Sequence, residues 1–172
     1  MTTNTSGVNG NSALTEILNS IDLGPTDSIQ FSFAKLQMAQ AQICKNKAND
    51  YMKQIEDVQA EQKEVAAMIS RARQLQTDAG TGTSTMPADM KKFFTDHGLA
   101  WDKTDNDDKH NKDEWTFNIQ SLTNYQESVS NQTQTLMVYL QDFISQYNSY
   151  TQGATSMIDK GAQVLTSVAT GR

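Results

Sequence analysis

The side chains best able to do chemistry in this sequence are two histidines and a single cysteine. His97 and His110 fall in a stretch without helical periodicity, and no third ligand stands at the spacing of a zinc site. Cys44 has no second cysteine to pair with in the chain, and its heptad position beside Ile43 favours a small buried side chain over a reactive thiol. A bridge between two chains stays open. These residues form no triad and no metal centre, so we expect a protein that is not an enzyme and uses no cofactor.

Two further patterns resemble ligand-binding motifs without completing them. Residues 105–108 (DNDD) supply carboxylates, but an EF-hand calcium loop would need glycine at its sixth position and glutamate at its twelfth. Gly80 and Gly82 lack the following Gly-Lys-Ser/Thr of a phosphate-binding loop. We interpret the first pattern as a solvated loop and the second as a linker. Trp101 and Trp115 flank the acidic loop, and we expect them to cap the open end of a coiled coil rather than stack on a ligand.

The elements that must position these residues are long, well-solvated helices. Only 37% of the 172 residues are hydrophobic and two are proline, which disfavours a large globular core and permits long helices. The net charge of −6 disfavours binding to nucleic acid or to an anionic membrane surface. No apolar run approaches the ~18 residues of a membrane span, and the N-terminus lacks the features of a Sec signal. We therefore expect no membrane insertion and no Sec export.

The first two predicted segments are an arm and a long helix. Residues 1–25 are interpreted as a disordered N-terminal arm or export signal, because residues 1–12 are nearly all Thr, Asn, Ser and Gly; a weak apolar stretch follows them. Residues 26–79 are predicted to form the first coiled-coil helix, with N-cap candidates up to Ser28. Gln40, Lys47 and Gln62 interrupt its apolar seam, which is spaced by fours and threes: Ile29, Phe33, Leu36, Ile43, Tyr51, Ile55, Val58, Val65, Ile69 and Ala72.

The remaining two segments are an irregular middle and a second long helix. Residues 80–112 are predicted to be a linker, a short helix from Pro87 to a stop at Gly98, and an acidic loop. Residues 113–172 are predicted to form the C-terminal coiled-coil helix. Its seam alternates steps of four and three without a slip: Trp115, Ile119, Leu122, Gln126, Val129, Thr133, Leu136, Leu140, Phe143, Tyr147, Tyr150, Ala154, Met157, Gly161, Val164 and Val168. The predicted fold is all-α, an antiparallel coiled-coil hairpin of two long helices.

The C-terminal helix carries more apolar surface than one partner helix can cover. A second line of apolar residues, which includes Tyr139, runs beside the seam. We therefore predict self-association or partner binding through this helix, and we expect Leu140→Asp or Ile158→Asp to abolish it. The predicted binding residues are Leu136, Leu140, Phe143, Ile144, Tyr147, Tyr150, Met157, Ile158, Val164, Leu165 and Val168.

Several segments together resemble the hydrophilic extracellular proteins of bacterial type III secretion. They are the Thr/Asn/Ser/Gly start, the long helix from Phe33-Ala34-Lys35-Leu36 onward, the proline-led residues 86–99 (MPADMKKFFTDHGL), and residues 134–150 (QTLMVYLQDFISQYNSY). The likeness covers most of the chain in layout and a few dozen residues in detail. It is better to the EspA-type and SseB-type filament proteins than to the LcrV-type and IpaD-type needle-tip proteins, because the chain is short and lacks an extra N-terminal hairpin.

This resemblance implies a virulence-associated structural protein at the bacterial surface. Members of the family are secreted without a Sec signal and self-assemble through their terminal helices into a filament, or cap the secretion needle. The implied partners are further copies of the chain, the needle protein, the pore-forming translocators and a cytoplasmic secretion chaperone. A cytoplasmic coiled-coil adaptor or secretion chaperone is the alternative from another class. Deleting residues 2–11 would separate the two, since only an exported protein needs that arm.

Overall fold

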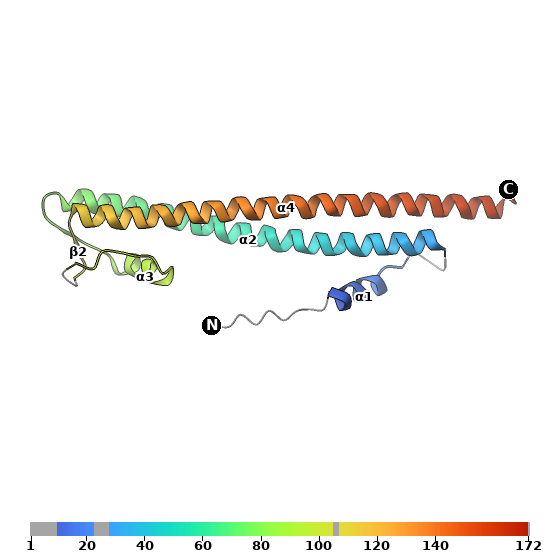
Figure 1. Ribbon diagram of the computed structural model, residues 1–172, viewed down its shortest axis with the longest axis horizontal. Helices are drawn as coiled ribbons and strands as arrows, with labels where there is room; N and C mark the ends of the chain where they lie inside the picture. The colour runs from blue at the N-terminus through green and yellow to red at the C-terminus, as the bar shows by residue number, and fades with distance from the viewer. Residues whose placement is uncertain (1–9, 23–27, 105–106, 172) are drawn as a thin grey trace. The chain divides into compact units, whose positions relative to one another are not determined.

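The computed structural model describes residues 10–22, 28–104 and 107–171. Two long helices dominate it, α2 (Ile29–Ala79) and α4 (Lys112–Ala169), packed antiparallel (Figure 1). Between them lie a short helix, α3 (Ala88–Asp96), and the two-residue strands β1 (Ser84–Thr85) and β2 (Lys109–His110). The predicted helical hairpin with a short middle helix is confirmed, while the small β pair was not predicted.

The chain divides into two compact units, each containing one part of α2 and one part of α4. The head unit is Lys53–Met137 and includes α3 and both strands. The terminal unit combines Met1–Met52 with Val138–Arg172.

The head unit holds the main hydrophobic core. On α2 its buried residues follow the predicted steps of four and three, and α3 contributes two phenylalanines. Trp115 and Leu122 are fully buried from the side of α4. The buried cluster comprises Val65, Ile69, Ala72, Ala79, Met86, Met90, Phe93, Phe94, Trp115 and Leu122. The predicted heptad seam is therefore the real packing face in this unit.

Local signals fix the ends of α3. Pro87 is the N-cap, with φ −66°, and the helix ends in a Schellman motif at Gly98, whose φ is +64°. There the Gly98 N–H donates to the Thr95 carbonyl at 3.2 Å and the Leu99 N–H to the Phe94 carbonyl at 2.8 Å. Both predicted boundary residues of the short helix are confirmed.

A short antiparallel ladder closes the segment that follows α2. Ser84 pairs with His110 and Thr85 with Lys109, and the Met86 N–H donates to the Asp108 carbonyl at 2.7 Å. This pairing buries His110, which is only 2% exposed. The predicted acidic loop is therefore corrected at β2, where His110 is buried, while Asp107, Asp108 and Asn111 are exposed as expected.

In the terminal unit, the buried face of α2 differs from the predicted one. Small residues line it, namely Ala34, Ala41, Cys44 and Ala48. The predicted seam residues Ile29, Phe33 and Leu36 are 83%, 42% and 38% exposed, and Lys47 is exposed as well. Steps of four and three residues back from Ile55 pass through Ala48, Cys44, Ala41 and Ala34, and miss Ile29, Phe33 and Leu36. The prediction followed the larger side chains and therefore selected the wrong face of the helix.

The seam predicted on α4 is correct for most of its length. Of its residues in the terminal unit, Ala154 and Gly161 are buried, and those from Leu140 to Met157 are otherwise partly buried. Val164 and Val168 are exposed, so the predicted seam continues beyond the packed contact.

The described part of the predicted disordered arm, residues 10–22, contains a helix. Helix α1 runs Gly10–Ser20, and its apolar residues are partly shielded at helical spacing: Leu14, Ile17, Leu18 and then Ile21 just beyond it. The expectation of disorder over residues 1–25 is thus corrected for this stretch. Residues 1–9 and 23–27 lie outside the described residues.

Among the described residues, no helix has a stretch that is both long enough and apolar enough to cross a bilayer.

Candidate functional site

The predicted binding residues occupy three different environments. Leu136 belongs to the head unit and is buried. Six residues of the terminal unit are partly buried along α4: Leu140, Phe143, Tyr147, Tyr150, Met157 and Ile158. Four more are substantially exposed: Ile144 (43%), Val164 (46%), Leu165 (46%) and Val168 (75%). The first two groups therefore contribute mainly to folding, and the exposed group is available to a partner.

The seam of the terminal unit is closed by aromatic and polar contacts across the two helices. Tyr51 of α2 stacks on Phe143 of α4, with ring centroids 5.6 Å apart. The ring of Tyr139, also on α4, is tilted relative to that of Tyr51, and these two centroids are likewise 5.6 Å apart. Phe31 packs on the backbone of Gly161. These contacts occupy one face of each helix.

Sequence reasoning missed the contribution of α2 to the exposed apolar surface, because it assigned those side chains to the seam. Ile29 and Phe33 instead line a groove of about 620 Å³ together with Met157 and Val164 of α4. Lys160 and three polar residues complete the lining. The terminal unit thus presents apolar side chains from both helices on one hollowed surface, which we call the terminal groove.

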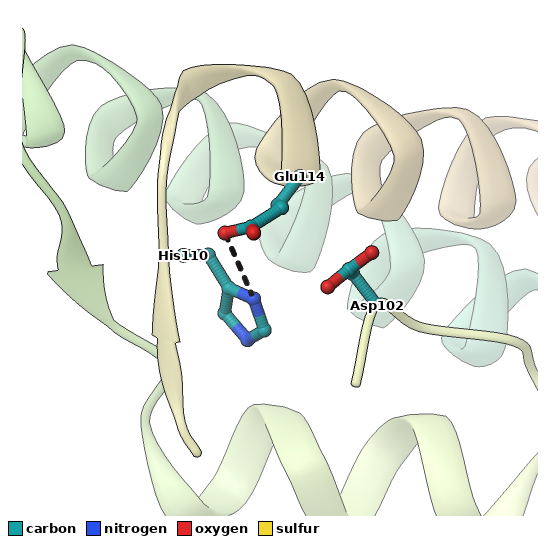
Figure 2. Close-up of side chains that lie close together, drawn as sticks. All are labelled: Asp102, His110 and Glu114. Atoms are coloured by element: carbon teal, nitrogen blue, oxygen red, sulfur yellow. Dashed lines mark ion pairs between the residues drawn. The ribbon is translucent and has the colours of Figure 1, made fainter. Parts of the chain in front are cut away.

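A second cluster lies in the head unit, where three potential metal ligands meet (Figure 2). Asp102 precedes the acidic loop, His110 comes from β2 and Glu114 from the first turn of α4. One ligand atom from each lies within 4.8 Å of the others. The sequence contained a partial signal, His110 and Glu114 four residues apart. No metal site was predicted, because no third ligand stood at the spacing of a zinc site.

The neighbouring backbone holds two of these three residues in place. Asn111 and Glu114 form a capping box at the start of α4: Asn111 Oδ1 accepts the Asp113 and Glu114 N–H groups at 2.8 and 3.0 Å, and Glu114 Oε2 accepts the Asn111 N–H at 2.7 Å. The fully buried Asn118 accepts the Asp102 N–H at 2.7 Å. The carboxylates therefore reach the cluster from fixed backbone positions.

The other histidine, His97, belongs to a hydrogen-bonded group that joins three helices. The Tyr125 hydroxyl donates to Glu61 and hydrogen-bonds with Nδ1 of His97 at 2.6 Å, and His97 lies 3.3 Å from Glu61. Burial, followed by the hydrogen bond and charge of Glu61, raises the pKa of Tyr125 to about 12. A raised pKa is the opposite of what a phenolate nucleophile needs, so this group fastens α3 to the long helices.

Cys44 is buried in the seam of the terminal unit, as predicted. Its Sγ lies 3.8 Å from Oε1 of Gln146 on α4. Burial and, to a smaller degree, the charge of Asp142 raise the pKa of the thiol above its usual value. The arrangement suits a small packing residue and disfavours thiolate chemistry.

Comparison of the chain with protein-family models, with curated proteins and with solved structures finds no match.

Proposed function

We propose that this chain is a structural protein that self-assembles through its terminal unit, and that its setting is the extracellular part of a bacterial type III secretion system. The observation that carries the proposal is the apolar surface left uncovered on both helices of that unit. Ile29, Phe33, Val164, Leu165 and Val168 all keep more than a third of their surface exposed.

The size of this surface is sufficient for association. Fully burying one large aliphatic side chain contributes ~1.5–3 kcal/mol. Association costs an estimated ~4–15 kcal/mol in lost motional freedom, so a single exposed leucine would not hold two chains together. Several such side chains, spread over successive turns of two helices, can exceed that cost.

The spacing of the apolar side chains on the two helices favours a helical partner. On α4, the exposed Ile144 and Leu165 and the partly buried Ile158 stand at intervals of seven residues, with Thr151 at the intervening position. On α2, the exposed Ile29 and Leu36 and the partly buried Ile43 also stand at intervals of seven. Apolar side chains at heptad spacing can pack against the side chains of a further helix in a coiled coil. The terminal unit of a second copy of the chain supplies such helices.

The biological setting comes from the sequence resemblance to EspA-type and SseB-type filament proteins. On this proposal the chain is secreted without a Sec signal, assembles into a filament or a cap on the needle, and supports delivery of effectors into host cells. Its partners are the needle protein and the pore-forming translocators, and a cytoplasmic chaperone covers the apolar surface before export. Such a cover would prevent the exposed apolar surface from driving association inside the cell.

The test compares two pairs of substitutions on the exposed face of α4. Ile144→Asp with Leu165→Asp places charge on the proposed contact line. Ser149→Asp with Ser156→Asp adds the same charge at exposed polar positions of the same helix. Sedimentation velocity and electron microscopy of the purified full-length chains report assembly, and circular dichroism reports helix content.

We expect oligomers or filaments for the natural chain and for the serine pair, and monomers with unchanged helix content for the apolar pair. Assembly of the apolar pair would overturn the proposed contact. A natural chain that stays monomeric at high concentration would overturn self-assembly altogether.

A further inference from the structure

We propose that Asp102, His110 and Glu114 bind a divalent transition-metal ion, of which Zn²⁺ is the best fit. The three side chains offer one imidazole nitrogen and two carboxylate oxygens from three separate segments of the head unit (Figure 2). Nothing in the self-assembly of the terminal unit depends on this site.

The unexplained feature of the cluster is the ring of His110. Its Nδ1 is buried and has no hydrogen-bond partner, although it points toward the carboxylate of Glu114. The separation from Glu114 Oε2 is 4.0 Å, too long for a hydrogen bond. A buried nitrogen left unpaired costs ~1–3 kcal/mol, and a bound ion would remove that cost.

The spacing fits an ion lying between the three ligand atoms. All three are within 4.8 Å of one another, so there is a point that lies within ~2.8 Å of each of the three atoms. Side-chain movements of well under an ångström then reach the ~2.0–2.2 Å of Zn–N and Zn–O bonds.

The surroundings supply support and access. Asn118 holds the backbone of Asp102, and the His110 ring lies edge-on to Trp115 with centroids 5.2 Å apart. A pocket of about 300 Å³ is lined by Asp102 and His110 and also by Asp107 and Asp108. Water or a further carboxylate can therefore complete the coordination from the pocket side.

The donor set separates this site from a calcium site. Ca²⁺ prefers six to eight oxygen ligands, whereas an imidazole with two carboxylates suits first-row transition metals. The capping box explains the position of Glu114 without any metal, but it leaves His110 Nδ1 unpaired. The two explanations predict different behaviour toward added Zn²⁺.

The experiment adds ZnCl₂ to the full-length chain after chelator treatment, with CaCl₂ as a parallel titration, and follows binding by calorimetry and thermal unfolding. The test variant combines Asp102→Asn with Glu114→Gln, because both substitutions keep the backbone hydrogen bonds and remove the ligand charges. Asp113→Asn is the matched control, an exposed carboxylate adjacent to Glu114.

We expect one Zn²⁺ per chain, a higher unfolding temperature with Zn²⁺, and affinity reduced at least tenfold in the double variant but not in the control. The histidine resonances provide a check that needs no variant: Zn²⁺ should shift those of His110 and leave those of His97 in place. Absence of Zn²⁺ binding, unchanged affinity in the double variant, a shift at His97 alone, or Ca²⁺ binding of equal strength would each overturn the proposal.

Discussion

The ring of Phe31 lies directly on the backbone of Gly161, so that a Cβ atom at residue 161 would stand 2.7 Å from its Cε2. This contact joins the start of α2 to the end of α4 within the terminal unit. It depends on the absence of a side chain at residue 161, since real Cβ atoms do not approach other atoms so closely.

Gly161→Ala should therefore destabilise the terminal unit. Alanine improves helix propensity by ~1 kcal/mol, but overpacking against an aromatic ring costs ~1–3 kcal/mol. Hydrogen exchange of the amides near Phe31 should become faster. Gly153→Ala is the control, because its nearest neighbour is the flexible Gln37 side chain at 3.1 Å, and it should leave exchange unchanged or slower. Equal effects of the two substitutions would contradict this account.

Ser84→Ala should destabilise the head unit by ~1–3 kcal/mol, measured by denaturant unfolding. The fully buried Trp115 donates its Nε1–H to Ser84 Oγ at 2.7 Å, and that hydroxyl in turn donates to the Leu75 carbonyl at 2.6 Å. Alanine leaves the indole N–H without its partner. Thr85→Ala, at the exposed neighbouring strand position, should cost much less. A similar loss in both variants would show that the hydrogen bond is unimportant.

The stability of the head unit should fall as the pH rises from about 10 to about 12. The pKa of Tyr125 is raised to about 12 in the folded chain, while an unfolded tyrosine titrates near 10. Between these values the unfolded chain has released the proton and the folded chain keeps it, so alkali favours unfolding. Urea unfolding of the natural chain and of Tyr125→Phe across this range should converge as the pH increases.

Glu61→Gln tests the cause of that shift separately. Removing the carboxylate should lower the pKa of Tyr125 toward its usual value, because the hydrogen bond and charge of Glu61 help to raise it. The absorbance of tyrosinate during an alkaline titration reports the change. An unaltered titration curve would mean that burial and the charge of Glu64 raise the pKa of Tyr125 without Glu61.

The Cys44 thiol should react with a disulfide reagent at least about tenfold more slowly in the folded chain than in denaturant. Burial raises its pKa and blocks access, and Asp142 adds to the shift through its charge. Cys44→Ala should fold normally, as three neighbours along the same seam are already alanine. Comparable reaction rates in both states would contradict the buried position.

Much of this architecture could be predicted because the signals are local. The breaks at Gly80 and at Pro87 to Gly98, and the heptads from Ile55 to Ala72 and from Trp115 to Gly161, depend on backbone preferences and spacing within a few turns. In these stretches, the face that packs on the opposite helix is the face that the local spacing already makes apolar.

Residues 29–51 show where local reasoning fails. Two phases compete there, one with large side chains such as Ile29 and Phe33, the other with small ones such as Ala34 and Ala41. Which phase is buried depends on the facing helix, where Phe143 stacks on Tyr51 and Gly161 leaves room for the ring of Phe31. The large residues are consequently left on the surface.

The cluster of Asp102, His110 and Glu114 was likewise beyond prediction. His110 pairs with Ser84 in the β1–β2 ladder and packs on Trp115, and Asn118 holds the backbone of Asp102 from a position 16 residues away. The sequence by itself determined that two long amphipathic helices would form and where they would end. Helix formation and termination depend on free-energy differences between residues within a few turns of one another. The tertiary structure alone decided which apolar face stayed uncovered and which ligands met, because both depend on contacts between residues far apart in the chain.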